Sequence, residues 1–328
     1  MGVKIAGLGK CLPEKIVTNN EMAQLVDTSH EWIIERTGIE RRHIATTESG
    51  VDMACAAAEE ALGDLDRRTI GLVLVATVTP DAIVPVNSCQ IKRRLNLENA
   101  IAFDMNAACS GFMYGLWNAE ALMKNGANPE SNTVEIQRAL VVGVERLSRI
   151  TNWEERSSCI LFGDGAGAAV LENDSREPGI LATFIKNYDD KKGALSCGKE
   201  YHGTPFWEDE PSPQLVTLHG RAIFKFAAGA IEEVTAAALG KAGLTLEEID
   251  WFVPHQANGR IIEAVSRRLG QPIEKFQISI RETGNVSAAS IPMAFYDLVQ
   301  SGKLKKGQKI AIIGFGGGLS AAAAIVQW

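Results

Sequence analysis

Cys109 is the residue of this sequence with the best setting for a nucleophile. It lies in Asn106-Ala-Ala-Cys-Ser-Gly, where the end of a short buried strand, at 101–104, is followed by small and apolar residues as far as Lys124 and Gly126. That run is too long for a strand and apolar on nearly every side, so we expect a helix in the interior. In its first turn, unpaired N–H groups and the macrodipole favour a thiolate. The alternative is that Cys109 is a small core residue.

His255 and Asn285 are further candidates for a reactive site. His255 lies in Trp251-Phe-Val-Pro-His-Gln-Ala-Asn, just past a buried strand, where side chains emerge into a crevice. Asn285 follows Gly284 at the start of a predicted helix. The alternatives are a core or turn histidine and a plain helix cap. Taken singly, neither residue establishes a site.

Trp32 and Arg36 could bind a nucleotide. They are four residues apart in a helix expected to end at Gly38, so they share one face. An aromatic plane beside a guanidinium can hold a base and its phosphates. The alternative is an ordinary surface contact.

Predicted strands and helices alternate along the chain, which indicates mainly parallel sheets covered by helices. The segments 126–138 and 189–214 are expected to be irregular, and the second could cover a substrate or be a surface excursion. A strand, a glycine turn and a second strand are expected over 159–171. Strands are predicted at 3–8, 70–77, 101–104, 139–144, 249–253, 308–315 and 321–327, and helices at 20–26, 52–62, 87–95, 220–239, 258–269 and 285–301.

Three units recur in the same order, which indicates a duplicated chain. Ala54-Cys-Ala-Ala-Ala-Glu-Glu-Ala-Leu resembles Val234-Thr-Ala-Ala-Ala-Leu-Gly-Lys-Ala, Asn106-Ala-Ala-Cys-Ser-Gly resembles Asn285-Val-Ser-Ala-Ala-Ser, and Phe162-Gly-Asp-Gly-Ala-Gly resembles Phe315-Gly-Gly-Gly-Leu-Ser. We therefore predict an N-terminal half at 1–172 and a C-terminal half at 173–328. A pseudo-twofold axis between them would place the starts of both central helices side by side, so that Cys109 and Asn285 converge.

Composition limits the classes of function. The chain has 328 residues and a formal net charge of −7, which argues against bulk nucleic-acid binding. Its six cysteines contain no C-x-x-C pair, which favours reduced thiols in a cytoplasmic protein. Lys4 and Lys10 argue against a signal peptide, and the glycines within 310–328 favour two strands there over a membrane anchor.

The motifs together resemble one family, the β-ketoacyl-[acyl-carrier-protein] synthases III, which are condensing enzymes of the thiolase fold. The resemblance covers essentially the whole chain. It implies duplicated βαβαβαββ halves in a five-layered α-β-α-β-α arrangement. It rests on Asn106-Ala-Ala-Cys-Ser-Gly-Phe, Pro254-His-Gln-Ala-Asn, Gly284-Asn-Val-Ser-Ala-Ala-Ser-Ile-Pro, Phe315-Gly-Gly-Gly, Phe162-Gly-Asp-Gly-Ala-Gly-Ala-Ala-Val-Leu and Glu31-Trp-Ile-Ile-Glu-Arg-Thr-Gly-Ile.

The resemblance also implies a reaction that initiates fatty acid synthesis. Cys109 would take the acyl group of an acyl-CoA, and malonyl-[acyl-carrier protein] would then condense with it, releasing CO2 and a β-ketoacyl thioester. His255 and Asn285 would donate hydrogen bonds to the malonyl thioester carbonyl. Backbone N–H groups of Cys109 and Gly317 would form the oxyanion hole. No metal or other cofactor is implied, because CoA and the carrier's phosphopantetheine arrive as substrates.

Binding roles are implied by the same resemblance. The enzyme would be a homodimer, and Val84 is smaller than the Phe with which the partner subunit can close the acyl pocket in the family. The CoA-binding residues would be Trp32 and Arg156 around the adenine, Arg36 at the phosphates and Asn258 at the pantetheine amide. The acidic carrier protein would dock on a basic rim of Lys225, Arg260, Arg267 and Arg268, although a solvated helix face is the alternative for the last two.

Departures from the family pattern leave the primer and acceptor open. Leu319-Ser320-Ala321-Ala322 replaces an aromatic, Thr and Trp-Gly, and Val286 replaces a usual Thr. A longer or branched primer is therefore possible. The nearest rival function is a homologue of secondary metabolism with a different acyl or acceptor substrate. A Cys-His-Asn hydrolase and a non-catalytic acyl-binding protein are further alternatives, but the hydrolase leaves the duplication and the Trp32–Arg36 pair unexplained.

Overall fold

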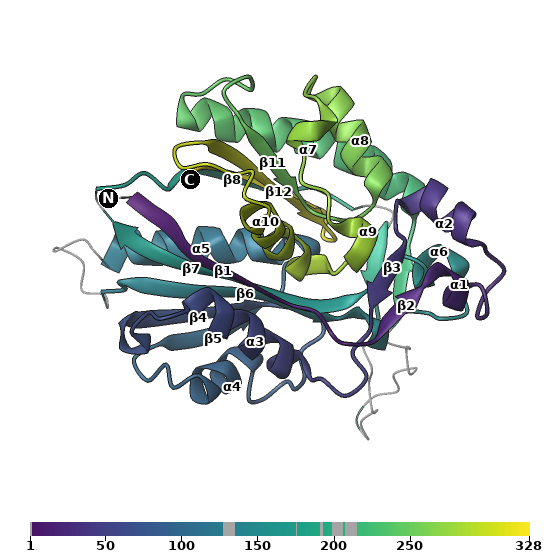
Figure 1. The fold of residues 1–328 in the computed structure, drawn as a ribbon, viewed down its shortest axis with the longest axis horizontal. Helices are drawn as coiled ribbons and strands as arrows, with labels where there is room; N and C mark the ends of the chain where they lie inside the picture. Colours follow the sequence, from purple (N-terminus) through teal and green to yellow (C-terminus); the bar gives the residue numbers. More distant parts are fainter. Residues whose placement is uncertain (1, 127–134, 175, 191–192, 199–205, 207–214) are drawn as a thin grey trace.

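The protein has five layers, with helices outside and between two sheets, in a computed structural model (Figure 1). The structure describes residues 2–126, 135–174, 176–190, 193–198, 206 and 215–328. Helices α3 (Gly50–Leu62) and α4 (Asn87–Arg94) cover one outer face, and α7 (Gly220–Ala242) and α8 (Gly259–Arg268) cover the other. Helices α5 (Gly111–Gly126) and α10 (Ser290–Gln300) lie between the sheets.

The first sheet has the strand order β1-β7-β6-β4-β5. Its β4–β5 and β4–β6 pairs are parallel, whereas β1–β7 and β6–β7 are antiparallel. Long apolar stretches of β4 and β6 are buried, as expected for strands covered by helices on both faces. The strands are β1 (Gly2–Cys11), β4 (Ile70–Ala76), β5 (Ile101–Met105), β6 (Arg138–Arg146) and β7 (Asp164–Asp174).

The second sheet, β8-β13-β12-β11, repeats this pattern with the same order and the same strand directions. Where the first sheet adds β5, the second adds a single parallel bridge between Phe252 and Phe276. The strands are β8 (Ile180–Asn187), β11 (Trp251–Pro254), β12 (Lys309–Gly316) and β13 (Ser320–Gln327). The duplication predicted from the sequence therefore appears in strand order and direction.

The remaining elements are short and lie at one end of the sheets (Figure 1). Strands β2 (Ile16–Thr18) and β3 (Arg41–His43) form one antiparallel pair, and β9 (Leu195–Cys197) and β10 (Val216–Leu218) form another. The helices here are α1 (Asn19–Met22), α2 (His30–Thr37), α6 (Arg156–Cys159) and α9 (Ile280–Thr283).

The two central helices start in the same unusual way. Asn106 accepts a hydrogen bond from the backbone N–H of Ala108 (3.1 Å), and Asn285 accepts one from Ser287 (2.8 Å). Ala108 and Ser287 both have left-handed backbone angles, with φ of 47° and 45°. A 3₁₀ turn follows in each case, Ala108–Ser110 before α5 and Ser287–Ala289 before α10. Non-glycine residues rarely adopt this conformation, so the shared strain marks both turns as candidates for function.

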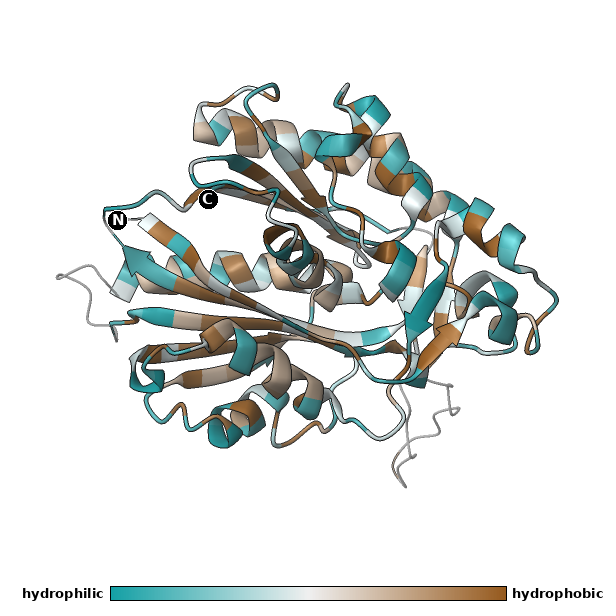
Figure 2. Cartoon of the chain, viewed as in Figure 1, coloured by the Kyte–Doolittle hydropathy of each residue, from teal (hydrophilic) through white to brown (hydrophobic). Residues whose placement is uncertain are grey.

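Two burial predictions need correction. Helix α5 is not interior on every side, because Trp117 and Leu122 are 46% and 38% exposed. The 101–104 strand was predicted to be buried, yet β5 is the edge of the first sheet and Ile101 is 47% exposed. Figure 2 shows that hydrophobic residues otherwise concentrate on the sheets and on the inner faces of the helices. Apolar composition alone does not distinguish a core position from an uncovered edge.

The glycine-rich segment over 159–171 was predicted wrongly as a turn between two strands. Cys159 ends helix α6, and one continuous strand, β7, begins at Asp164. Its glycines permit close packing of α10, since a Cβ at Gly167 would lie 2.8 Å from the backbone nitrogen of Met293.

Part of the two predicted irregular segments lies outside the described residues, namely 127–134, 191–192, 199–205 and 207–214. Within 189–214, residues Leu195–Cys197 form β9 rather than irregular chain. The substrate-covering role of that segment remains a prediction. Among the described helices, none is long and apolar enough to cross a membrane.

Candidate active site

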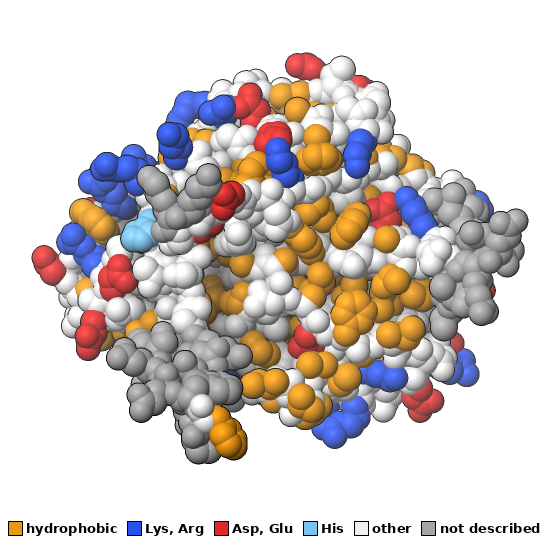
Figure 3. Space-filling model, turned by 180° about the vertical axis from the view of Figure 1, so that it is seen from behind, with side chains coloured by type: hydrophobic (Ala, Val, Ile, Leu, Met, Phe, Trp, Pro, Cys, Tyr) orange, Lys and Arg blue, Asp and Glu red, His pale blue; other side chains and the backbone are white. Residues whose placement is uncertain are grey.

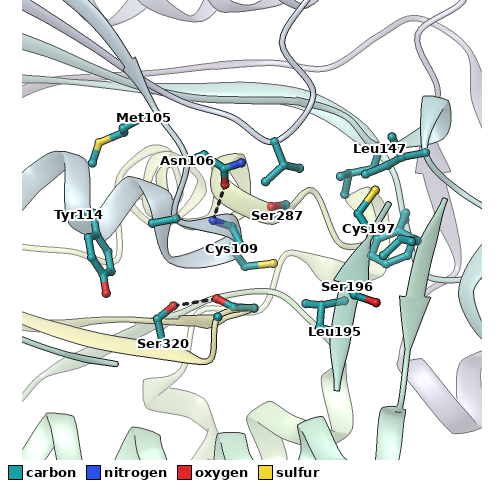
Figure 4. Close-up of a pocket in the computed structure, with 18 of the residues that line it drawn as sticks. Met105, Asn106, Cys109, Tyr114, Leu147, Leu195, Ser196, Cys197, Ser287 and Ser320 are labelled. Carbon is teal, nitrogen blue, oxygen red and sulfur yellow. Dashed lines mark hydrogen bonds between the residues drawn. The ribbon is translucent and has the colours of Figure 1, made fainter. Parts of the chain in front are cut away.

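Cys109 lies where two cavities meet. The large cavity, of about 690 Å³, is lined by Met105, Tyr114, Ser196 and Ser320 among others, and Figure 4 shows Cys109 at its centre. The narrow cavity, of about 310 Å³, contains Cys109, His255 and Asn285 together with Trp32, Arg36 and Asn258. The structure thus brings the three predicted reactive residues to one cavity, with predicted CoA-binding residues lining the same space.

The second half of the chain packs directly on the Cys109 turn. A Cβ at Gly316 would lie 2.9 Å from both the nitrogen and the Cβ of Cys109, so only glycine fits there. Correspondingly, a Cβ at Gly143 on β6 would lie 2.4 Å from the carbonyl oxygen of Ala288 in the other turn. Each 3₁₀ turn is therefore seated against the sheet of the opposite half. Gly317, the other predicted oxyanion-hole residue, lines the large cavity beside Cys109.

Cys109 is a protonated thiol in the resting structure. Its side chain is buried, and burial raises its pKa to about 11, while a polar contact with Ser287 lowers the pKa only in part. This direction is opposite to the thiolate expected from the helix start, because desolvation outweighs the hydrogen bonds that stabilise the charge. The proton of the thiol therefore has to be removed as the sulfur attacks.

His255 is neutral and rigidly held. Its backbone N–H donates to Ile313 (2.7 Å), and its ring packs edge-on against Phe315 at 5.1 Å between centroids. Burial lowers its pKa to about 3. Its Nδ1 is buried, and no hydrogen-bond partner for it is found in the described part of the chain. A buried acceptor without a partner costs less than a buried N–H without one, which favours the proton on Nε2.

Asn285 caps a turn and also lines the narrow cavity, so it has both features that the sequence suggested. Its N–H donates to Leu161 (2.8 Å), its carbonyl accepts from Gly163 (3.0 Å), and Gly284 before it has a φ of 66°. Its side-chain oxygen caps the following turn through Ser287. The amide Nδ2 is consequently the donor that can serve a substrate in the narrow cavity.

Trp32 and Arg156, the predicted adenine-binding residues, pack against each other. Cζ of Arg156 lies 4.6 Å from the centroid of the Trp32 ring, and Cζ of Arg36 lies 5.7 Å from it. Arg156 also donates to the carbonyl of Asp27 (2.8 Å). A base can enter between Trp32 and Arg156 only if the guanidinium moves away from the indole.

Asn258 has structural contacts in this conformation. Its side-chain oxygen accepts from the N–H of Arg260 (2.9 Å) at the start of α8, and its Nδ2 donates to the carbonyl of Arg36 (3.1 Å). It therefore joins α8 to α2 at the wall of the narrow cavity.

Two residues of the predicted basic rim, Arg267 and Arg268, lie beside acidic side chains. Arg268 forms an ion pair with Glu232, and Arg267 lies 3.8 Å from Glu263. Lys225 lines a shallow surface hollow with Arg221. Figure 3 shows Lys and Arg side chains gathered on the end of the molecule where α2 and α8 lie in Figure 1. The solvated-face interpretation therefore gains support for Arg267 and Arg268.

The sequence predictions missed Ser287 and Glu145. Ser287 lines the large cavity beside Cys109 (Figure 4). Glu145 is fully buried at the end of β6. A signal for each was present: Glu145 directly follows a buried apolar strand, and Ser287 occupies the position in the second repeat that corresponds to Ala108.

Comparison with known proteins places this geometry in a family. Residues 103–188 match the family model described as 3-oxoacyl-[acyl-carrier-protein] synthase III, and residues 239–328 match its C-terminal model. The chain is 40% identical to β-ketoacyl-[acyl-carrier-protein] synthase III of Clostridium beijerinckii, over 99% of both proteins. This chain belongs to the β-ketoacyl-[acyl-carrier-protein] synthase III family. As a synthase III it is a condensing acyltransferase that initiates fatty acid synthesis.

Solved structures of synthases III confirm the predicted thiolase fold. The 3-oxoacyl-[acyl-carrier-protein] synthase III of Aquifex aeolicus superposes with a TM-score of 0.90 at 39% identity, covering 100% of both chains. The priming β-ketosynthase of the R1128 polyketide pathway superposes with a TM-score of 0.91 at 34% identity, covering 99% of this chain and 96% of that one. The fold is therefore shared by a synthase III and by a ketosynthase of a polyketide pathway.

Proposed function

We propose that Cys109, His255 and Asn285 perform the synthase III reaction, in which an acyl-CoA primer is condensed with malonyl-[acyl-carrier protein]. The observation that supports this assignment is their convergence on one narrow cavity that Trp32 and Arg36 also line. A thioester that enters past the indole and the guanidinium would present its reactive carbonyl to the sulfur.

The proposed chemistry uses each group in the state described above. Cys109 attacks the acyl-CoA thioester, and CoA leaves. Backbone N–H groups of Cys109 and Gly317 stabilise the oxyanion, each contributing about 3 kcal/mol. Neutral His255 and the Asn285 amide then donate hydrogen bonds to the malonyl thioester carbonyl, so that the enolate left by CO2 is stabilised. The carbanion attacks the acyl group on Cys109.

Mass spectrometry of the intact protein tests this function. After exposure to acetyl-, isobutyryl- or octanoyl-CoA, we expect a mass increase of one acyl group, mapped to Cys109, and its loss when malonyl-carrier is added. The volume of the large cavity and the small residues Ser320, Ala321 and Ala322 support acceptance of primers longer than acetyl. Hydrolysis without release of CO2 from the malonyl thioester would instead indicate a hydrolase, and absence of any acyl adduct would refute the assignment.

The likeness to the R1128 priming ketosynthase makes the form of the malonyl substrate, carrier-bound or CoA-bound, a property to test. That enzyme of a polyketide pathway shares this fold at 34% identity. Comparing malonyl-carrier with malonyl-CoA in the same discharge assay distinguishes the two forms, since initiation of fatty acid synthesis requires the carrier-bound malonyl group.

We further propose a homodimer in which the division into halves 1–172 and 173–328 is retained in each subunit. Edge strand β5 exposes Ile101 and Phe103, which are 47% and 37% exposed. Ile83 and Val84, which precede α4, are 84% and 81% exposed. An open, apolar sheet edge is a surface that a second copy can cover. Val84 does not line the large cavity of its own chain, which is consistent with a role at the acyl pocket of the partner subunit.

Replacing Val84 by phenylalanine tests that role. If its side chain closes the partner's acyl pocket, Val84→Phe should lower acylation by octanoyl-CoA roughly tenfold relative to acetyl-CoA, because a larger group shortens the pocket. Leu25→Phe, at another exposed apolar position, is the matched control. Unchanged chain-length preference in Val84→Phe would remove Val84 from the acyl pocket.

Charge reversal tests the carrier-docking surface. Lys225→Glu and Arg260→Glu should each raise the KM for malonyl-carrier roughly tenfold, because complementary charge acts mainly on association. Their acylation by acyl-CoA should be unchanged. Lys303→Glu, in an exposed loop, is the control. Equal losses toward CoA and carrier substrates would argue against a dedicated docking surface.

A further inference from the structure

Glu145 is a fully buried carboxyl directed at the catalytic turns. It lies on β6 two residues after Gly143, so both residues face the same side of the sheet. That side carries the turn Ser287–Ala289, because Gly143 lies against the backbone of Ala288. A charged residue at such a position is costly unless it has a specific use.

Glu145 accepts hydrogen bonds from one neighbouring loop. The hydroxyls of Thr79 (2.6 Å) and Thr77 (3.2 Å) and the N–H of Val78 (3.1 Å) contact its carboxyl oxygens. Each hydroxyl accepts a backbone hydrogen bond elsewhere, so each donates its proton to Glu145. The adjacent Arg146 lies 3.8 Å from Asp81 instead. Within the described part of the chain, no cation forms an ion pair with Glu145, which leaves the carboxyl able to take up a proton.

Ser287 connects Glu145 to the nucleophile. Its hydroxyl lowers the pKa of both the Cys109 thiol and the Glu145 carboxyl, as a polar neighbour of each group does. Figure 4 shows Ser287 beside Cys109, and its left-handed φ of 45° fixes its position in the turn. Ser287 is therefore a neighbour of both the Cys109 sulfur and the Glu145 carboxyl, at the wall of the large cavity.

The ionisation states of Cys109 and Glu145 suit proton transfer. Burial raises the pKa of Glu145 to about 7, whereas burial lowers the pKa of His255 to about 3. A thiol with a pKa of about 11 thus loses its proton more readily to Glu145 than to His255. Among the described residues, Cys109 in the facing turn interacts electrostatically with Glu145, and Arg146 follows it in β6.

We propose that Glu145 is a positioning residue that accepts the Cys109 proton through Ser287 during acylation and returns it after condensation. This inference rests on the assignment of Cys109 as the acylated nucleophile.

Every proton and electron pair is accounted for in this step. The S–H bond of Cys109 breaks, its proton passes to the Ser287 oxygen, and the Ser287 hydroxyl proton passes to a Glu145 oxygen. The sulfur forms a bond with the acyl carbon, and the CoA thiolate that leaves takes a proton from solvent. When the malonyl-derived carbanion later displaces Cys109, the released thiolate regains its proton from Glu145 by the reverse path.

Rapid-quench mass spectrometry of single-turnover acylation tests the proposal. Glu145→Gln keeps the shape of the side chain but cannot take up the proton, and acylation should fall at least 10²-fold, as for loss of a general base. The opposite sign is expected if Glu145 is only a nearby charge. Its charge raises the pKa of Cys109, so its removal alone would accelerate acylation. An unchanged or faster rate in Glu145→Gln overturns the proposal.

Two further measurements distinguish proton transfer through Glu145 from a purely structural role of that residue. Malonyl-carrier decarboxylation in a Cys109→Ala background needs no thiol, so adding Glu145→Gln should leave it unchanged; a parallel loss there would indicate a structural role and overturn the proposal. The wild-type acylation rate should also rise through pH of about 7 as Glu145 loses its proton, and Glu145→Gln should lack that inflection. Retention of the inflection would contradict the proposal.

Ser287→Ala provides a second test if Glu145→Gln does not fold. It removes one hydroxyl and should slow acylation to a similar extent, without a further loss in the double variant; a wild-type rate would refute the path. Glu120→Gln is the matched control, because Glu120 is another buried carboxyl, in the helix that follows Cys109, and it pairs with Lys124. If wild-type enzyme forms no adduct at Cys109, the catalytic assignment itself fails, and that outcome is distinct from a wild-type rate in Glu145→Gln.

Discussion

Replacing Cys109 by alanine should abolish formation of the acyl-enzyme, with a loss of condensation on the order of 10⁶-fold, as when the nucleophile of a covalent mechanism is removed. The variant should still release CO2 from malonyl-carrier, because the hydrogen bonds to the enolate come from His255 and Asn285 rather than from the sulfur. Intact-protein mass spectrometry and a ¹⁴CO2 release assay measure the two activities separately.

Cys109→Ser is the informative companion variant. Serine retains a hydroxyl in place of the thiol but is a poorer nucleophile at the same position. A Cys109→Ala protein that still became acylated would transfer the nucleophile role to another residue. Cys197, which also lines the large cavity, would then be the first position to examine.

Replacing His255 by alanine should stop the reaction after acylation. One hydrogen bond to the developing enolate is lost, which should lower kcat roughly 10²–10³-fold. Since His255 is neutral and its pKa is lowered to about 3, it is a donor and not the base for the thiol. Acyl-enzyme should therefore form at the normal rate and accumulate when malonyl-carrier is supplied.

Asn285→Ala should show the same accumulation, and the double variant should lose less than the sum of the two free-energy changes, because both groups serve one oxygen. Normal turnover in His255→Ala would exclude the proposed hydrogen bond. Failure of that variant to become acylated would instead make His255 the base, and would also contradict the path through Glu145.

Features that arise from repetition and motif spacing could be predicted from the sequence. The duplication of the chain, the convergence of Cys109, His255 and Asn285, and the termination of α2 at Gly38 all agree with expectation. These features depend on local sequence patterns that occur twice, or on residue types that have few structural or chemical roles. The same motifs predicted the family.

Properties that depend on three-dimensional environment were not predicted. The pKa of Cys109 is raised because neighbouring elements from both halves exclude water, and the helix start gives no indication of that. Glu145 and Ser287 were missed because their meeting depends on how β6 packs against a turn about 140 residues further along the chain. The exposed edge at β5 was mistaken for core because its sequence is as apolar as a buried strand.

Each of the two 3₁₀ turns packs against the sheet of the opposite half. This arrangement has a consequence for assembly. Neither half contains the backbone surface that fixes its own turn, since Gly316 supports Cys109 and Gly143 supports Ala288. A separated fragment would carry either the sulfur or the imidazole and carboxamide, but with its turn unsupported. Activity should consequently emerge only when both halves have folded and docked, and it should disappear as soon as either half unfolds.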